Sequence, residues 1–176
     1  MIRFFALLCI LSACEYQDKA QAFDDPQIES LNVSNEDQLN IIYEKFESYR
    51  SQFPGATNIK PDEALLLDNP VYVDVREKNE YRVSMIKDSL TKDEFLNNKE
   101  LYRNRNIVVY CTIGYRSGLF SNALTNAGFS SFNLLGGVLL WSHYGFEFFN
   151  EGLLSDRVHT YSKEWNHLHS DYRAIY

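Results

Sequence analysis

Two short runs of β-branched and aromatic residues most constrain the fold of this 176-residue chain: VYVDV at residues 71–75 and NIVVY at residues 106–110. Both are apolar at nearly every position, which is typical of strands buried on both faces. A parallel sheet covered by helices on its two faces buries strands in this way. The sequence therefore predicts an α/β fold with a mainly parallel central sheet and helices on both faces.

Helical patterns alternate with these strands along the chain. Apolar residues recur at helical spacing between residues 36 and 50, and Ser34 or Asn35 suits the N-cap of that helix. Residues 116–127 predict another helix, with Gly128 as its C-terminal cap. Further strands are expected at residues 58–60 and 132–134, and further helices or helical turns at residues 61–67, 77–83, 93–103 and 136–141. This alternation favours the parallel sheet.

The first fourteen residues have the order of a secretory signal. Arg3 supplies a positive charge, residues 4–11 form an apolar run, and small residues precede Cys14. The run is shorter than the about 20 residues that a membrane-spanning helix needs. The string LSAC, residues 11–14, resembles the lipobox of bacterial lipoproteins, in which the cysteine is acylated and becomes the new N-terminus.

The lipobox resemblance implies that residues 1–13 are a signal peptide, that Cys14 is lipidated and that residues 14–35 are a tether. It predicts a lipoprotein anchored to a membrane of the bacterial cell envelope, facing the periplasm or the exterior. Glu15, in place of the Asp that often signals inner-membrane retention, favours the outer membrane. An ordinary signal peptide that contains a cysteine is the alternative.

The rest of the chain divides into three predicted parts: an N-terminal helical extension at residues 36–56, the main domain at residues 57–150 and a C-terminal tail at residues 151–176. The tail is rich in aromatic residues and histidine. His167 and His169 are too few ligands for a metal site, so we expect no metal and a tail packed across the domain surface. The formal net charge of −7 disfavours a broad nucleic-acid surface. No oligomeric state is predicted.

The segment NIVVYCTIGYRSG, residues 106–118, carries the candidate chemistry. A buried strand leads into Cys111, and a helix is expected to begin near Arg116. At the carboxyl end of a parallel strand, a thiol faces the positive end of the next helix and free backbone N–H groups, which favour the thiolate. Gly114 permits a positive φ that turns N–H groups inward, and Arg116 can pair with an oxyanion. The alternative is a small apolar cysteine that ends a buried strand.

The same segment resembles the active-site loop of rhodanese domains. VYVDVREKNEY, residues 71–81, is similar to the strand-and-turn motif of that family, and AGFSSFNLLGGVLLW, residues 127–141, is similar to its closing motif. The three motifs occur in the family order across about residues 57–150. The resemblance implies a rhodanese-like fold, here with an added N-terminal helix and a C-terminal tail.

Carried over residue by residue, the resemblance implies that Cys111 takes the outer sulfur of a small anionic donor, such as thiosulfate or a persulfide, and becomes a persulfide. A thiophilic acceptor then removes the sulfur, without a cofactor. The residues expected to bind the persulfide and the donor are Thr112, Ile113, Gly114, Tyr115 and Arg116.

The resemblance also implies a set of residues that support the loop. Asp74 and Arg76 match the acidic and basic pair that braces it in the family, and Ser117 follows the loop directly. A strand-end ion pair without a chemical role is the alternative for Asp74 and Arg76. Glu80 carries a weaker signal.

Loop length separates sulfur transfer from related chemistries. Cys111 to Arg116 spans six residues, C-x4-R, whereas related phosphatases and arsenate reductases use a longer C-x5-R loop. A phosphatase or arsenate reductase is therefore one alternative to a sulfurtransferase. Another is a non-catalytic binding scaffold, which would need neither Cys111 nor Arg116. A thiol–disulfide oxidoreductase would need a second free cysteine. Residues 84–90, SMIKDSL, depart from the usual GHIPGA turn, so we expect a changed loop there.

Overall fold

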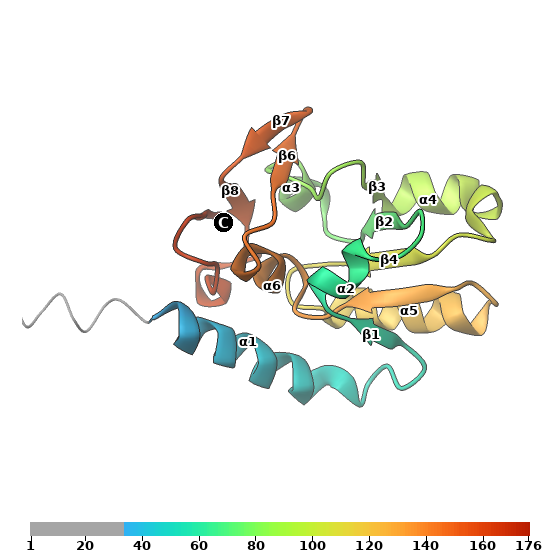
Figure 1. Cartoon of the computed structure of the whole chain (residues 1–176), viewed down its shortest axis with the longest axis horizontal. Helices are drawn as coiled ribbons and strands as arrows, with labels where there is room; N and C mark the ends of the chain where they lie inside the picture. Colours follow the sequence, from blue (N-terminus) through green and yellow to red (C-terminus); the bar gives the residue numbers. More distant parts are fainter. Residues whose placement is uncertain (1–33) are drawn as a thin grey trace, which may run out of the picture. The chain divides into compact units, whose positions relative to one another are not determined.

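The computed structural model describes residues 34–176 (Figure 1). The predicted signal peptide, Cys14 and most of the predicted tether lie outside the described residues. Within residues 34–176, no helix combines the length and the apolar character needed to cross a membrane.

The core of the fold is a five-stranded parallel sheet, which confirms the predicted fold class. The strand order is β1 (Thr57–Ile59), β5 (Ser131–Leu134), β4 (Ile107–Tyr110), β2 (Val71–Asp74) and β3 (Leu90–Thr91). In the central register, Val109 of β4 lies between Val73 of β2 and Asn133 of β5. The two strands predicted first, β2 and β4, are neighbours at the centre of the sheet.

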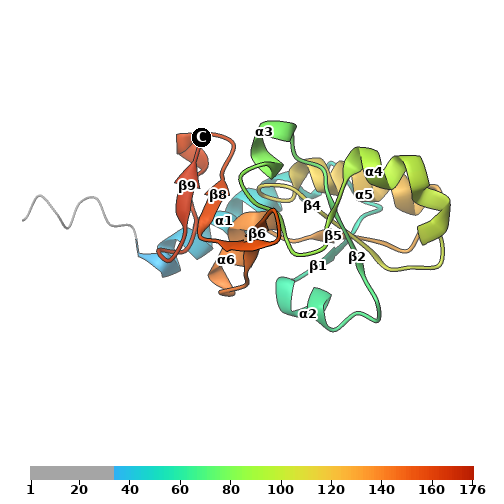
Figure 2. The same ribbon diagram turned by 90° about the horizontal axis from the view of Figure 1, so that it is seen from above.

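Helices cover both faces of this sheet. They are α1 (Asn35–Arg50), α2 (Pro61–Leu65), α3 (Lys78–Tyr81), α4 (Lys92–Asn98), the 3-10 helix η1 (Lys99–Tyr102), α5 (Tyr115–Asn126) and α6 (Gly137–His143). Figure 2 shows α4 and α5 on one side of the sheet and α2 and α6 on the other. The single helix expected at residues 93–103 is divided into α4 and η1.

Alternation along β4 decides which face each side chain joins. Ile107, Val109 and Cys111 belong to an apolar cluster that includes Phe95 of α4 and Leu124 of α5. The intervening Val108 and Tyr110 belong to the second cluster, on the side of α2 and α6. Because side chains alternate with a period of two along a strand, this register places Cys111 on the α5 side.

The C-terminal tail folds into strands that the sequence patterns did not predict. An antiparallel hairpin, β6 (Phe148–Asn150) with β7 (Leu153–Ser155), crosses the predicted boundary at residue 150. A parallel pair follows, β8 (Arg157–His159) with β9 (Arg173–Ile175), joined through the 3-10 helix η2 (Lys163–Trp165).

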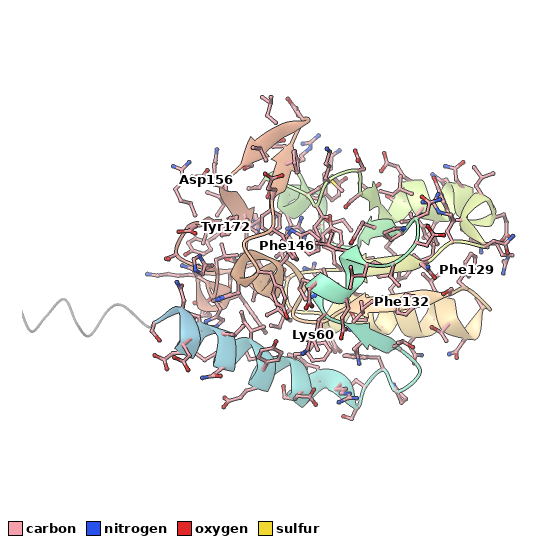
Figure 3. The ribbon with its side chains drawn as sticks, in the orientation of Figure 1. Lys60, Phe129, Phe132, Phe146, Asp156 and Tyr172 are labelled. Atoms are coloured by element: carbon pink, nitrogen blue, oxygen red, sulfur yellow. The ribbon has the colours of Figure 1, made fainter. Side chains whose placement is uncertain are left out.

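Tail residues bury apolar surface and bond to the rest of the domain. Val158 and Leu168 are buried in the cluster on the α6 side. The hydroxyl of Tyr172 donates a hydrogen bond of 3.0 Å to the Phe146 carbonyl oxygen, and Figure 3 labels both residues at this end of the molecule. The tail therefore packs across the domain, as the sequence analysis expected.

Candidate active site

The candidate nucleophile Cys111 follows the last residue of β4, and Gly114 is the N-cap of α5. Gly114 has φ +98°, and its backbone N–H donates to the Cys111 sulfur at 3.2 Å. A Cβ at Gly114 would lie 2.8 Å from the Phe46 ring. Glycine is therefore required here both by the left-handed backbone and by the closely packed helix α1.

Polar groups hold the loop around the sulfur. Cys111 is only 1% exposed, and the Ser117 hydroxyl oxygen lies 3.5 Å from its sulfur. The same hydroxyl donates to Asn133 Oδ1 at 2.7 Å, and Asn133 Nδ2 donates to the Gly114 carbonyl oxygen at 3.0 Å. Asn133 of β5 thus bonds the loop and the first turn of α5 together, a role that sequence reasoning missed.

The start of α6 supports the other side of the loop. The Val138 N–H donates to the Cys111 carbonyl oxygen at 3.0 Å, and the Leu139 N–H donates to the Thr112 carbonyl oxygen at 3.3 Å. Gly137 has φ +52°, and a Cβ there would overlap the Cys111 carbonyl oxygen. Gly137 of the closing sequence motif therefore lets the start of α6 lie against the backbone of the cysteine.

Arg116 bonds to Glu80 of α3 and also lines the cavity over the loop, so its predicted contact with a donor anion stays a prediction. Its Nη1 and Nη2 donate to the two Glu80 carboxylate oxygens at 2.6 and 2.7 Å. The Thr112 hydroxyl donates to the same carboxylate at 3.2 Å. Glu80 is buried, and the Arg116 side chain is 28% exposed.

This ion pair shifts the pKa of both groups. Burial raises the pKa of Glu80, but hydrogen bonds from Arg116 and the Glu77 N–H, with the charges of Arg116 and Arg76, outweigh it and lower the pKa below its usual value. Burial lowers the pKa of Arg116, and its bonds to Glu80 together with the nearby charge of Cys111 outweigh that effect and raise it. The pair is therefore ionised at neutral pH.

Asp74 and Arg76 form a fully buried ion pair beside this site. Arg76 Nε and Nη2 donate to the Asp74 carboxylate, and Nη2 also donates to the Ser84 carbonyl oxygen at 2.6 Å. In residues 34–176, the hydrogen bonds of this pair reach the segment at Ser84 and none reaches the loop at residues 111–117. The predicted bracing role of Asp74 and Arg76 stays a prediction; the charge of Arg76 adds to the lowering of the Glu80 pKa.

A cavity of about 460 Å³ opens over the loop. Its lining residues are Tyr49, Gln52, Cys111, Thr112, Ile113, Tyr115, Arg116, Tyr161 and Trp165. The loop residues among them are predicted from the sequence, whereas Tyr49, Gln52, Tyr161 and Trp165 are not. The aromatic richness of the tail was the only signal for Tyr161 and Trp165.

Comparisons with known proteins agree with this fold. Residues 60–144 match the model of the rhodanese-like domain family. The chain is 25% identical over 138 residues to the tRNA uridine(34) hydroxylase of Corynebacterium efficiens, covering 69% of this chain and 43% of that protein. It is 26% identical over 136 residues to the protein of the same name from an Arthrobacter species, covering 66% and 45%. The chain thus spans less than half the length of these relatives.

A solved structure shows the same fold. The thiosulfate sulfurtransferase of Pseudomonas aeruginosa aligns with a TM-score of 0.51 at 19% sequence identity. The alignment covers 64% of this chain and 23% of that one.

Proposed function

We propose that the rhodanese-like domain of this chain is a sulfurtransferase that carries sulfane sulfur on Cys111. The observation that supports this most is the position of Cys111 at the carboxyl end of β4, in a six-residue loop whose Gly114 N–H donates to its sulfur. A backbone N–H and the positive start of the twelve-residue helix α5 stabilise a negative charge on sulfur at this point. Cys111 is among the residues that line the cavity over the loop, where a donor and an acceptor would bind.

The reaction has two nucleophilic steps. In the first, the Cys111 thiolate attacks the outer sulfur of the donor, a new S–S bond forms, and the bond from that sulfur to the rest of the donor breaks. The leaving group departs with the electron pair, as sulfite does from thiosulfate. In the second step, an acceptor such as cyanide, sulfite or a thiol attacks the outer sulfur of the persulfide and releases the Cys111 thiolate. Two such half-reactions predict ping-pong kinetics.

Intact-mass measurement tests the proposal directly. The protein, freed of residues 1–33 by expression from residue 34, is incubated with thiosulfate, inorganic polysulfide or an organic persulfide, and the Cys111→Ser variant is treated in parallel. We expect the addition of one sulfur atom to the unsubstituted protein alone, and its removal by cyanide. Absence of the adduct with every donor would exclude sulfur transfer and favour a binding scaffold.

Hydroxylation of a tRNA uridine is the second candidate, because two relatives of 25–26% identity carry that name. The chain spans less than half of those proteins, and its net charge of −7 supplies no general attraction for RNA. Modified uridine in tRNA incubated with the protein, with no sulfur on Cys111, would favour this activity over sulfur transfer.

We also propose that the protein is anchored in the cell envelope through acylated Cys14, on the basis of the LSAC string. The Cys14→Ala variant should be released from the membrane fraction and lack fatty acid. A variant that stays with the membranes would contradict the anchor.

A further inference from the structure

Arg116 is the one charged residue among the described residues that line the cavity. The Glu80 carboxylate already compensates its charge, because both terminal nitrogens of Arg116 donate to that carboxylate. A dianion such as thiosulfate would lose hydration on entry without meeting an uncompensated cation. The cavity therefore offers little to a small, doubly charged donor.

The walls of the cavity are aromatic. Tyr49 and Tyr115 lie with ring centroids 5.1 Å apart, and Tyr161 and Trp165 line the same space from the tail. The volume of about 460 Å³ lies in the range of pockets that hold organic molecules and exceeds what a small inorganic anion fills. Aromatic walls of this kind favour an apolar or aromatic group.

Tyr161 is held in a backbone conformation that bulky residues rarely adopt. Its φ is +73°, and its N–H donates to His159 Nδ1 at 3.0 Å. The left-handed region is unfavourable for a non-glycine residue, and such strain is concentrated at functional sites. Tyr161 is 60% exposed, so burial does not explain the conformation.

The position of the Tyr161 ring explains it better. The ring centroid lies 5.5 Å from the Arg116 guanidinium carbon, within the range of a cation–π contact. The Arg116 guanidinium thus contacts both the Glu80 carboxylate and the Tyr161 ring. Tyr161 also lines the cavity with an apolar surface.

We propose that this cavity selects an organic sulfane-sulfur donor that carries an aromatic or branched apolar group and at most one negative charge. The inference rests on the proposed sulfur transfer by Cys111 and names its substrate class. With a thiosulfonate, the thiolate attacks the sulfane sulfur, the new S–S bond forms, and the bond between that sulfur and the sulfonyl sulfur breaks. A sulfinate leaves with the electron pair, and charge is conserved.

Three probes separate charge from shape: thiosulfate, methanethiosulfonate and benzenethiosulfonate. The rate constant for sulfur addition to Cys111 is measured by intact mass for each probe, and divided by the rate constant with glutathione in solution to remove intrinsic reactivity. We expect benzenethiosulfonate to exceed methanethiosulfonate by at least about tenfold, with thiosulfate slowest. Equal corrected rate constants, or thiosulfate fastest, would overturn the inference.

Variants then test the aromatic wall. Trp165→Ala and Tyr161→Gly should each lower the ratio of benzenethiosulfonate to methanethiosulfonate by about threefold or more. Glycine adopts the backbone conformation of residue 161 without strain, so this variant should stay folded. Tyr176→Ala, an exposed tail aromatic outside the cavity, is the matched control and should leave the ratio unchanged.

The outcomes distinguish the two proposals. Sulfur addition at equal corrected rates with all probes, or a ratio insensitive to Tyr161 and Trp165, would refute the donor class while sulfur transfer stands. No sulfur addition with any probe would refute sulfur transfer itself.

Discussion

Replacing Glu80 with glutamine tests the ion pair with Arg116 next to the candidate nucleophile. Glutamine keeps the size of the side chain and can still accept the 2.8 Å hydrogen bond from the Glu77 N–H. It removes the negative charge that faces Arg116. It also places an amide N–H₂ group, a hydrogen-bond donor, against a guanidinium that has no acceptor. Removal of one partner from a buried pair costs about 3–5 kcal/mol. Because the Arg116 side chain is 28% exposed and water can reach it, we expect a loss of about 2–3 kcal/mol.

The effect should depend on pH in a defined direction. The pKa of Glu80 is lowered from 4.5, because bonds from Arg116 and Glu77 outweigh the effect of burial. A carboxyl group with a lowered pKa contributes stability that is fully present above its unfolded pKa and is lost as pH falls through its folded pKa. The difference in unfolding free energy between the wild type and Glu80→Gln should therefore shrink as pH falls below 4.5.

Urea denaturation at neutral pH and below pH 4.5 measures both effects. The matched control is Glu100→Gln, which removes the partner of Arg103 in a pair exposed at the surface, so its effect should be clearly smaller. A loss below about 1 kcal/mol for Glu80→Gln at neutral pH, or one equal to that of the control, would refute the reasoning. The same variant leaves Arg116 uncompensated and should raise the rate with thiosulfate relative to methanethiosulfonate.

Two further predictions concern Gly137, which packs against the loop, and His159 of the tail strand β8. Gly137→Ala should destabilise the fold by at least about 3 kcal/mol in urea denaturation, because its Cβ would overlap the Cys111 carbonyl oxygen. Gly145→Ala, at φ +70° with open space around its Cβ, is the control and should cost only about 1–2 kcal/mol. Burial lowers the pKa of His159 below 6.5; the charge of Glu80 opposes this shift, and the charges of Arg76 and Arg116 add to it. The unfolded chain then binds a proton that the native protein does not, so stability should fall below pH 6.5 with a slope of at most about 1.4 kcal/mol per pH unit from this residue. An unchanged slope in His159→Gln would contradict this assignment.

The sequence by itself determined the features that depend on neighbouring residues. Apolar runs identified β2 and β4, and the two strands lie side by side at the centre of the sheet. The left-handed backbone at residue 114 is one that glycine permits, and the sequence places Cys111 directly after a buried strand. Hydrophobic periodicity and backbone preference act over a few residues, so a sequence pattern carries them.

Only the tertiary structure decided which group Arg116 faces and what covers the loop. Glu80 lies 36 residues before Arg116, and an arginine on a surface helix has many rotamers until a partner selects one. The tail strands β8 and β9 have three residues each, too few for a periodic pattern, and a parallel pairing between them is set by packing against the domain. Tyr161 and Trp165 therefore reach the cavity through contacts between distant parts of the chain, which no local pattern contains.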